Sequence, residues 1–279
     1  MDVSAADVKR LREKTGAGMM DCKNALVKSG GDIDKAVRLL KEQGLAAAAR
    51  KSGRATGAGK IFIKMLPGKA VVLELDCETD FVVKNEMFQK LGTALVDMVA
   101  AQNLAAKTDA MELMVKEAIG TIKENMALAR FTTVAAGADE TLVDYVHEDR
   151  IGVVVKAKLS DPKLAADPAV KQTLFECALH LAAFAPQFLS REKVPAEWLK
   201  DQESIFQEQV KAMDKPANVL QGIVKGKVNK LLAEVCFLEQ PFVKDEKRKV
   251  AKVLEDLGKQ VGGTVAAVDF VYFKVGEAA

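Results

Sequence analysis

Apolar residues in the first 54 positions recur at intervals of three or four, which is the pattern of amphipathic helices. Ser4 and Asp32 are good N-cap residues, and Gly16-Ala17-Gly18 is the first of two glycine breaks that separate three short helical segments. We expect the third helix to stop at Gly44, because glycine often follows the last helical turn, although the alanine-rich stretch Leu45–Arg50 can extend a helix. Three helices this short bury only a thin core, which is typical of a small binding module.

Strand-like and helical patterns alternate in the next part of the chain. The small, polar, glycine-rich stretch Lys51–Gly59 predicts a linker in front of them, and Pro67-Gly68 predicts a hairpin turn. This alternation favours an α+β fold with mainly antiparallel sheets. The expected strands are Lys60–Leu66, Ala70–Cys77, Phe131–Val134, Leu142–His147 and Ile151–Leu159, and the expected helices are about Glu86–Ala101 and Met111–Ala129.

From about residue 170 the pattern is helical over a long stretch. Ala196–Met213 and Ala217–Leu232 each have an apolar stripe and are separated by a short connection. Two such helices pair antiparallel, so we expect a helical hairpin at about 195–232. The chain then returns to strand, helix and strand, with the first of these strands at Glu234–Val243.

The stretch "CETDFVVKN", Cys77–Asn85, places an acid and a phenylalanine where a predicted strand ends. A similar form, Glu239-Gln240-Pro241-Phe242-Val243, occurs near the C-terminus. The similarity suggests that the two halves of the α+β region are built alike. It also predicts the same backbone turn at Phe81 and at Phe242, in which case Asp80 would be the feature that distinguishes the two copies.

The chain has 279 residues, of which 41 are basic and 39 acidic, and a formal net charge of +2. Although residues 1–54 lean basic, the total charge gives no reason to expect nucleic acid or an anionic membrane as a partner. Four cysteines without metal-ligand spacing stand among apolar residues, so we expect buried free thiols and a cytoplasmic location. There is no signal-peptide pattern, and no apolar run approaches the roughly 20 residues of a membrane helix.

A search for catalytic or cofactor-binding groups finds no site. The spacing of His147 and His180 supports no catalytic triad, and His180 lies in an apolar helix where a core role is expected. There is no cluster of metal ligands, and Gly53–Lys60 lacks the spacing of a phosphate-binding loop. We therefore expect no cofactor, no direct nucleotide binding and no enzymatic chemistry, but a binding protein or a regulator of another protein.

Six stretches of the chain stand out as motifs. They are "KTGAGMMDCKNAL" (Lys14–Leu26), "GGDIDKAVRLL" (Gly30–Leu40), "CETDFVVKN", "YVHEDRIGVVV" (Tyr145–Val155), "HLAAFAPQFL" (His180–Leu189) and "LEQPFVKD" (Leu238–Asp245). In this order along the chain they resemble the translation elongation factor Ts family, and the resemblance covers almost the whole sequence. One departure lies after His147, where the family often has a glycine and this chain has Glu148-Asp149-Arg150.

The resemblance implies a guanine nucleotide exchange factor for the GTPase elongation factor Tu, acting in translation elongation. It also implies a UBA-like three-helix module, a core of two similar antiparallel-sheet and helix subdomains, and an inserted antiparallel coiled coil. On this basis we divide the chain into the module at 1–54, subdomain N at 55–140 and subdomain C at 141–279, with the hairpin inserted in subdomain C.

By matching position, the resemblance implies that Thr79, Asp80, Phe81 and Val82 form the segment that displaces the magnesium ion bound to the GTPase. Phe81 would be the inserted side chain. An exposed aromatic ring suits this task, because it gains buried area only when the partner opens. Asp80 could compete for a hydrogen-bond donor, fix the backbone of Phe81, or do both.

The resemblance also implies contacts from Arg12, Met19 and Met20 of the helical module to the GTPase, and a further core contact from His147. Methionine suits an adaptable protein contact. Helix periodicity does not easily bury two adjacent positions, and of the two methionines we expect Met20 to be the one that packs in the core.

Two other functions are considered. An adaptor that binds another protein through a UBA-like module, without effect on nucleotide, is the alternative, and an enzyme with an unrecognised site is the least favoured. The sequence leaves three roles open for the hairpin, which could dimerise the factor, contact the GTPase or only brace the fold. A homodimer within a heterotetramer is one possible assembly.

Overall fold

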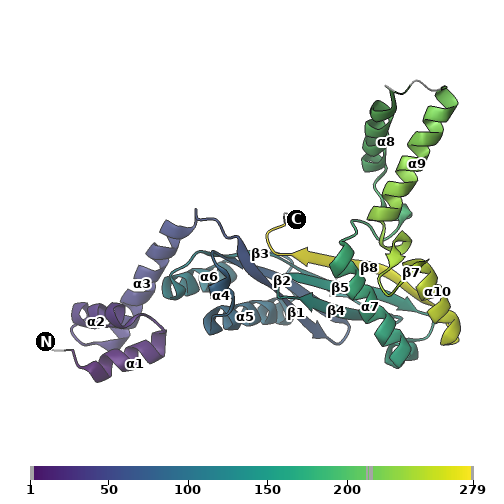
Figure 1. Ribbon diagram of the computed structural model, residues 1–279. Helices are drawn as coiled ribbons and strands as arrows, with labels where there is room; N and C mark the ends of the chain where they lie inside the picture. Colours follow the sequence, from purple (N-terminus) through teal and green to yellow (C-terminus); the bar gives the residue numbers. More distant parts are fainter. Residues whose placement is uncertain (1–2, 212, 214–215, 278–279) are drawn as a thin grey trace.

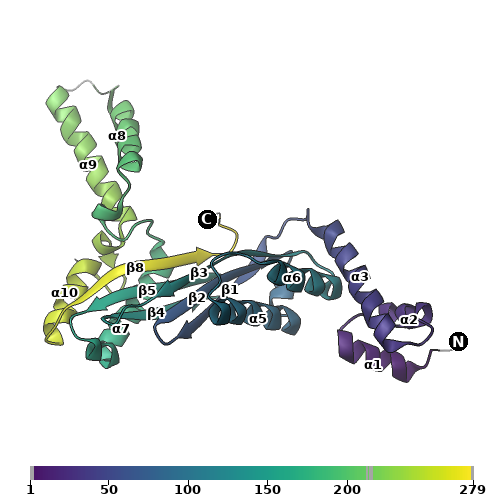
Figure 2. The same ribbon diagram turned by 180° about the vertical axis from the view of Figure 1, so that it is seen from behind.

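A computed structural model describes residues 3–211, 213 and 216–277. They form an elongated molecule with a helical module at one end, a body of sheets and helices, and a projecting helical hairpin near the other end (Figure 1). The same arrangement is seen from behind (Figure 2). The α+β fold class with antiparallel sheets is confirmed.

The helical module consists of α1 (Ala5–Thr15), α2 (Met19–Lys28) and the first half of α3 (Ile33–Lys51). The side chains of Ser4 and Asp32 accept hydrogen bonds from backbone N–H groups at the starts of α1 and α3, as their N-cap roles predict. Leu11, Cys22 and Leu26 are fully buried and form the centre of the small core.

The prediction that the third helix stops at Gly44 is wrong, because α3 continues to Lys51. Gly44 instead meets Gly120 of α6, which places the two helix backbones in contact. A Cβ atom on Gly120 would lie 2.6 Å from the Cα atom of Gly44. The glycine therefore permits a close helix crossing, at a cost in helix propensity of about 1 kcal/mol.

The first sheet has the order β1-β2-β3, with antiparallel pairs throughout. Pro67-Gly68 forms the tight connection between β1 and β2, and Gly68 has the positive φ of 71° that such a turn requires. Three helices separate β2 from β3. The elements are β1 (Ala58–Leu66), β2 (Lys69–Cys77), α4 (Asp80–Val83), α5 (Glu86–Gln102), α6 (Asp109–Ile122) and β3 (Met126–Ala135).

The expected helix over Met111–Ala129 is too long. Lys123 adopts a left-handed conformation and ends α6, and Met126 already pairs with Cys77 as the start of β3. The apolar residues in this stretch fit a helix or a strand, so pairing with β2 decides between them.

The second sheet repeats this topology with the order β4-β5-β8. A helix of 17 residues follows the central strand in both halves, as α5 and as α7. Each central strand also has a register shift at the same place, between Glu74 and Leu75 in β2 and between Lys156 and Ala157 in β5. The elements are β4 (Glu140–His147), β5 (Ile151–Leu159), the 3-10 helix η1 (Pro162–Ala166), α7 (Pro168–Phe184), α10 (Val250–Gln260) and β8 (Val265–Lys274).

The two sheets pack face to face and are covered by helices on their outer faces. Ile61, Val72 and Val154 belong to the core between the sheets. Residues of α5 and α6 pack on the outer face of the first sheet, and residues of α7 and α10 pack on that of the second. The ends of these sheets therefore determine where the connecting loops emerge.

A long insertion separates α7 from α10. It contains η2 (Arg191–Lys193), α8 (Ala196–Lys211), α9 (Ala217–Val235), η3 (Phe237–Glu239), β6 (Pro241–Phe242) and β7 (Asp245–Lys249). Helices α8 and α9 pack on each other, and most of their connection lies outside the described residues. The expected strand at Glu234–Val243 is wrong over most of its length, because α9 and η3 occupy half of it and the strand β6 is limited to Pro241–Phe242.

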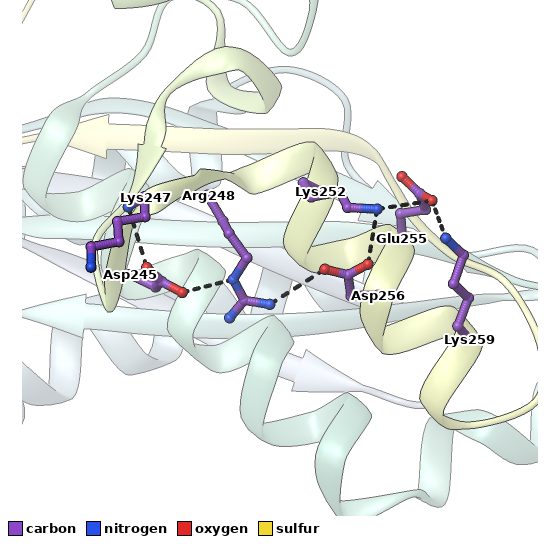
Figure 3. Close-up of polar contacts among 7 residues, drawn as sticks. All are labelled: Asp245, Lys247, Arg248, Lys252, Glu255, Asp256 and Lys259. Atoms are coloured by element: carbon purple, nitrogen blue, oxygen red, sulfur yellow. Dashed lines mark hydrogen bonds and ion pairs between the residues drawn. The ribbon is translucent and has the colours of Figure 1, made fainter.

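A row of surface ion pairs runs along β7 and α10, and the pair of Arg248 with Asp256 joins the two elements (Figure 3). Arg248 contacts Asp245 at 2.7 Å and Asp256 at 3.5 Å, and Lys252 contacts Asp256 at 3.0 Å. Such exposed pairs each contribute at most about 1 kcal/mol.

Candidate partner-binding site

The Phe81 segment (residues 79–82) leaves the end of β2 and forms most of the single helical turn α4. Phe81 is 80% exposed, the largest value among the large apolar side chains of the described residues. Its neighbour Val82 is 6% exposed and packs in the core of the first sheet. Asp80 is exposed, and within the described part of the chain its carboxylate makes no hydrogen bond or ion pair. The turn therefore presents an acid and an aromatic ring to solvent and anchors itself through Val82.

A single turn of helix has no stability of its own, so its position depends on contacts to other elements. The connector at residues 123–125, between α6 and β3, supplies two of them. The Thr79 hydroxyl donates to the Glu124 carboxylate at 3.0 Å, and the Asn125 backbone N–H donates to Glu78 at 2.6 Å. The second bond lowers the pKa of Glu78 and keeps this carboxylate a charged acceptor.

The thiol of Cys77 also supports the turn, since it donates to the Thr79 carbonyl at 3.1 Å. Burial, and secondarily the charge of Glu124, raises the pKa of Cys77 to about 12, so the sulfur keeps its proton. The cysteine is a buried structural donor here, as expected for the four free thiols.

Further polar contacts connect the other side of α4 to the β4–β5 turn. The Gln89 amide donates to the Val83 carbonyl at 2.5 Å, and the Lys60 ammonium donates to Gln89 at 2.9 Å. Lys60 also contacts the Asp149 carboxylate at 2.9 Å. The Phe81 segment and the turn after His147 thus lie at the same end of the packed sheets.

His147 is exposed at the end of β4. The Tyr145 hydroxyl lies 2.9 Å from the Nδ1 atom of His147, and the ring of exposed Phe175 packs edge-on against Tyr145. In the following turn Glu148 and Asp149 both have positive φ, 48° and 62°, a conformation that costs non-glycine residues energy. Helical periodicity along α7 could have identified Phe175 as an outward-facing residue. Its contact with Tyr145 of β4 could not be derived from that periodicity.

The helical module exposes its own apolar surface. Arg12 is exposed, and Met19 and Met20 are 46% and 64% exposed. The expectation that Met20 packs in the core is wrong, because Cys22, Ala25 and Leu26 form the buried stripe of α2 and Met20 lies on another face.

Sequence reasoning missed Val27, which is 56% exposed and lies two turns after Met20 on the same face of α2. The seven-residue spacing was the signal that could have identified it.

The module meets the body at the crossing of α3 and α6. Two ion pairs flank this crossing, Lys41 with Glu117 at 3.0 Å and Asp21 with Lys123 at 3.3 Å. A cavity of about 450 Å³ lies beside it. Because Asp21 follows Met20 and Lys123 precedes Glu124, the same connector meets both α2 and the Phe81 segment.

The structure corrects the comparison of Phe81 with Phe242. Phe242 lies in β6 and is 2% exposed, with its ring near that of His180. The two phenylalanines therefore do not share a backbone turn. His180 is a satisfied core residue as expected, because Nδ1 accepts from the Val243 N–H at 3.1 Å and Nε2 bonds to Gln240 at 2.8 Å.

Two carboxylates lie buried between the sheets. Glu74 accepts from Arg130 at 2.6 Å and from the Gly276 N–H at 2.8 Å. Among the residues that the structure describes, one buried oxygen of Asp76 has no hydrogen-bond partner. Burial, with the nearby charge of Glu74, raises the pKa of Asp76 to about 7.

Other kinds of site are not found in the part of the chain that the structure describes. Residues 3–211, 213 and 216–277 contain no group of three or more His, Cys, Asp or Glu placed to hold a metal ion. Among the same residues no helix is both long and apolar enough for a membrane span.

Comparison with known proteins gives one consistent result. A sequence model described as Elongation factor TS matches residues 78–277. Elongation factor Ts of Treponema denticola is 43% identical over 277 residues, covering 99% of both chains. That of Treponema pallidum is 39% identical with 99% of both chains covered, and that of Borrelia hermsii is 37% identical, covering 99% of this chain and 100% of its own.

Proposed function

The chain belongs to the elongation factor Ts family, and from this we propose that it is the guanine nucleotide exchange factor of elongation factor Tu in translation elongation. Such a factor makes and breaks no covalent bond. It binds the GTPase more tightly when the nucleotide is absent, and by linkage it weakens the nucleotide by the same ratio. The surface it needs is one of differential contacts between two states of the partner.

The observation that carries the proposal is the 80% exposure of Phe81 on a turn whose backbone is held by buried or half-buried neighbours. An exposed phenylalanine is costly to solvate and gains about 1.5–3 kcal/mol when it becomes buried. If that burial occurs only in the open GTPase, the energy is available to drive nucleotide release. Phe81 is in our proposal the side chain inserted into the partner.

We further propose that residues 79–82 together disturb the magnesium ion that the GTPase holds beside its nucleotide. The cation neutralises phosphate charge, so a small displacement of its ligands removes much of the attraction. Asp80 is exposed beside Phe81 and suits competition for a donor on the partner. Thr79 and Val82 hold the turn.

The other contacts in the proposal divide between two surfaces. Arg12, Met19 and Met20 bind the GTPase from the helical module, and Val27 extends the apolar face of α2. His147 binds it from the end of β4, beside the Phe81 segment.

We also propose the finer architecture that the family suggests. Residues 1–54 form a UBA-like module, 55–140 and 141–279 form the two core subdomains, and α8 with α9 forms an antiparallel coiled coil. The factor works in the cytoplasm, and a homodimer within a heterotetramer is the assembly to test by measuring the mass of the complex.

Release of labelled GDP from elongation factor Tu, with and without the protein, tests the exchange function. We expect a large acceleration at saturating factor. A complex that forms without any acceleration would favour the alternative, an adaptor that uses its helical module only for binding. Comparing Asp80→Ala with Phe81→Ala then separates the acid from the ring.

A further inference from the structure

The side chain of Phe81, which makes the proposed contact, is mostly exposed to solvent. Packing within the protein therefore cannot orient the ring. What fixes the ring is the backbone of α4, a helix of only four residues. Its anchors are Val82 in the core, Gln89 on one side and the connector at residues 123–125 on the other.

The connector is well suited to this purpose. Asn125 is 5% exposed, and besides donating its N–H to Glu78 it donates its side-chain amide to the Arg54 carbonyl at 2.7 Å. Glu124 is half-buried and places both oxygens 3.0 Å from the Thr79 hydroxyl. The bonds to Thr79, Glu78 and Arg54 join residues 45, 47 and 71 positions apart in sequence.

The backbone conformation just before Glu124 places Glu124 and Asn125 next to residues 78 and 79. Lys123 has φ 70°, a left-handed conformation that ends α6 and turns the chain back toward β2. Its N–H still bonds to the Ile119 carbonyl at 3.0 Å, so the turn is tied to the helix. Glu124 and Asn125 are therefore presented to residues 78 and 79 from a rigid helix end.

We propose that Glu124 and Asn125 are positioning residues for nucleotide exchange, which hold the Phe81 segment in the geometry that the partner meets. This rests on the proposed function. A segment that is already ordered pays less conformational entropy when it binds, and charge-assisted hydrogen bonds are the stronger kind. Loss of the Glu124 bond should therefore slow the exchange step and leave the contacts of the helical module unchanged.

The test compares Glu124→Ala with Glu124→Gln, which keeps an acceptor for Thr79. The control is Glu112→Ala, which removes an exposed acid on α6 that pairs with Lys116. Amide hydrogen exchange of the free protein reports on residues 78–85. GDP release is measured against factor concentration, which separates the maximal rate from the half-saturating concentration.

Glu124→Ala is expected to speed hydrogen exchange at residues 78–85 and to lower the maximal release rate about three- to tenfold, with an unchanged half-saturating concentration. Glu124→Gln should fall between Glu124→Ala and the parent, because its amide oxygen still accepts from Thr79 but without the charge, and Glu112→Ala should resemble the parent. Parent-like hydrogen exchange at residues 78–85 in Glu124→Ala would overturn the proposal whatever the release rates. If the parent protein itself fails to accelerate release, the proposed function is wrong, and hydrogen exchange still decides whether Glu124 orders the segment.

Discussion

The segments that leave the two central strands have the same course and different surfaces. In subdomain N the chain passes from β2 through α4 into α5, and in subdomain C it passes from β5 through η1 into α7. Phe81 lies four positions after the end of β2, and Lys163 lies four positions after the end of β5. Both side chains are exposed. The residues that follow them, Val82 and Leu164, pack against the core of their own half.

This comparison shows which part of the segment the fold requires. An apolar anchor is retained in both halves, whereas the exposed aromatic is present in only one. A lysine serves equally well at that place in subdomain C, so packing gives no reason for Phe81. This supports the proposal that a partner covers Phe81. The sequence similarity had matched Phe81 with Phe242, which is a buried residue of the insertion and not the structural counterpart.

The largest expected effect is the difference in the free energy of unfolding between alanine variants of Phe242 and Phe81. Phe242→Ala should lower the free energy of unfolding by about 3–5 kcal/mol, because it empties a packed site against His180. Phe81→Ala should change it by less than about 0.5 kcal/mol. Urea unfolding measures both. Comparable losses in the two variants would mean that Phe81 is also structural.

The next effect tests the true counterparts. Phe81→Ala should slow GDP release from elongation factor Tu by roughly 10- to 100-fold, which corresponds to the burial energy of one phenylalanine. Lys163→Ala should leave release unchanged. A parent-like rate of GDP release with Phe81→Ala, or an equally slow rate with Lys163→Ala, would contradict the comparison.

The two central strands, β2 and β5, also carry opposite charges at equivalent positions on the faces that meet between the sheets. Asp76 of β2 is buried, whereas its counterpart Lys158 of β5 is exposed and pairs with Asp139 at 3.0 Å. The pKa of Asp76 is about 7 in the folded protein against 3.8 ordinarily, so the folded state binds the extra proton. The contribution of Asp76 to the free energy of unfolding therefore falls as pH rises from about 4 to 7 and stays low above that.

Asp76→Asn should remove this dependence, because a neutral amide can donate to Glu74 without ionising. We expect the variant to gain about 1–2 kcal/mol in the free energy of unfolding at pH 8 and little at pH 4. Urea unfolding across this range measures the difference between variant and parent. A gain that is the same at every pH would contradict the assignment of the titration to Asp76.

The smallest effect concerns the turns that join the first two strands of each half. Gly68 supplies the positive φ in subdomain N, whereas Glu148 must adopt one in subdomain C. Glu148→Gly should raise the free energy of unfolding by about 0.5–1 kcal/mol, since relief of backbone strain exceeds the added entropy of the unfolded chain.

The matched variant Gly68→Ala should lower the free energy of unfolding by a similar amount. Thermal unfolding measures both variants. An unchanged midpoint for Glu148→Gly would show that the two turns do not differ in strain.

The sequence by itself determined the features that depend on near neighbours. The caps at Ser4 and Asp32, the turn at Pro67-Gly68 and the helical hairpin follow from residues within a few positions of one another. The motifs around Lys14–Leu26 and Cys77–Asn85 were enough to indicate the family, because they are long.

The tertiary structure decided the rest. Gly44 resembles a helix stop in sequence, and only its contact with Gly120 shows why a glycine stands inside a helix. The apolar residues of β3 fit the periodicity of a helix as well as that of a strand, and their pairing with β2 decides for the strand. The exposure of Phe81 depends on where β2 ends and on which residues Glu124 and Asn125 can reach. These outcomes join residues far apart in the chain, and hydrophobic periodicity carries no information on which distant groups will meet.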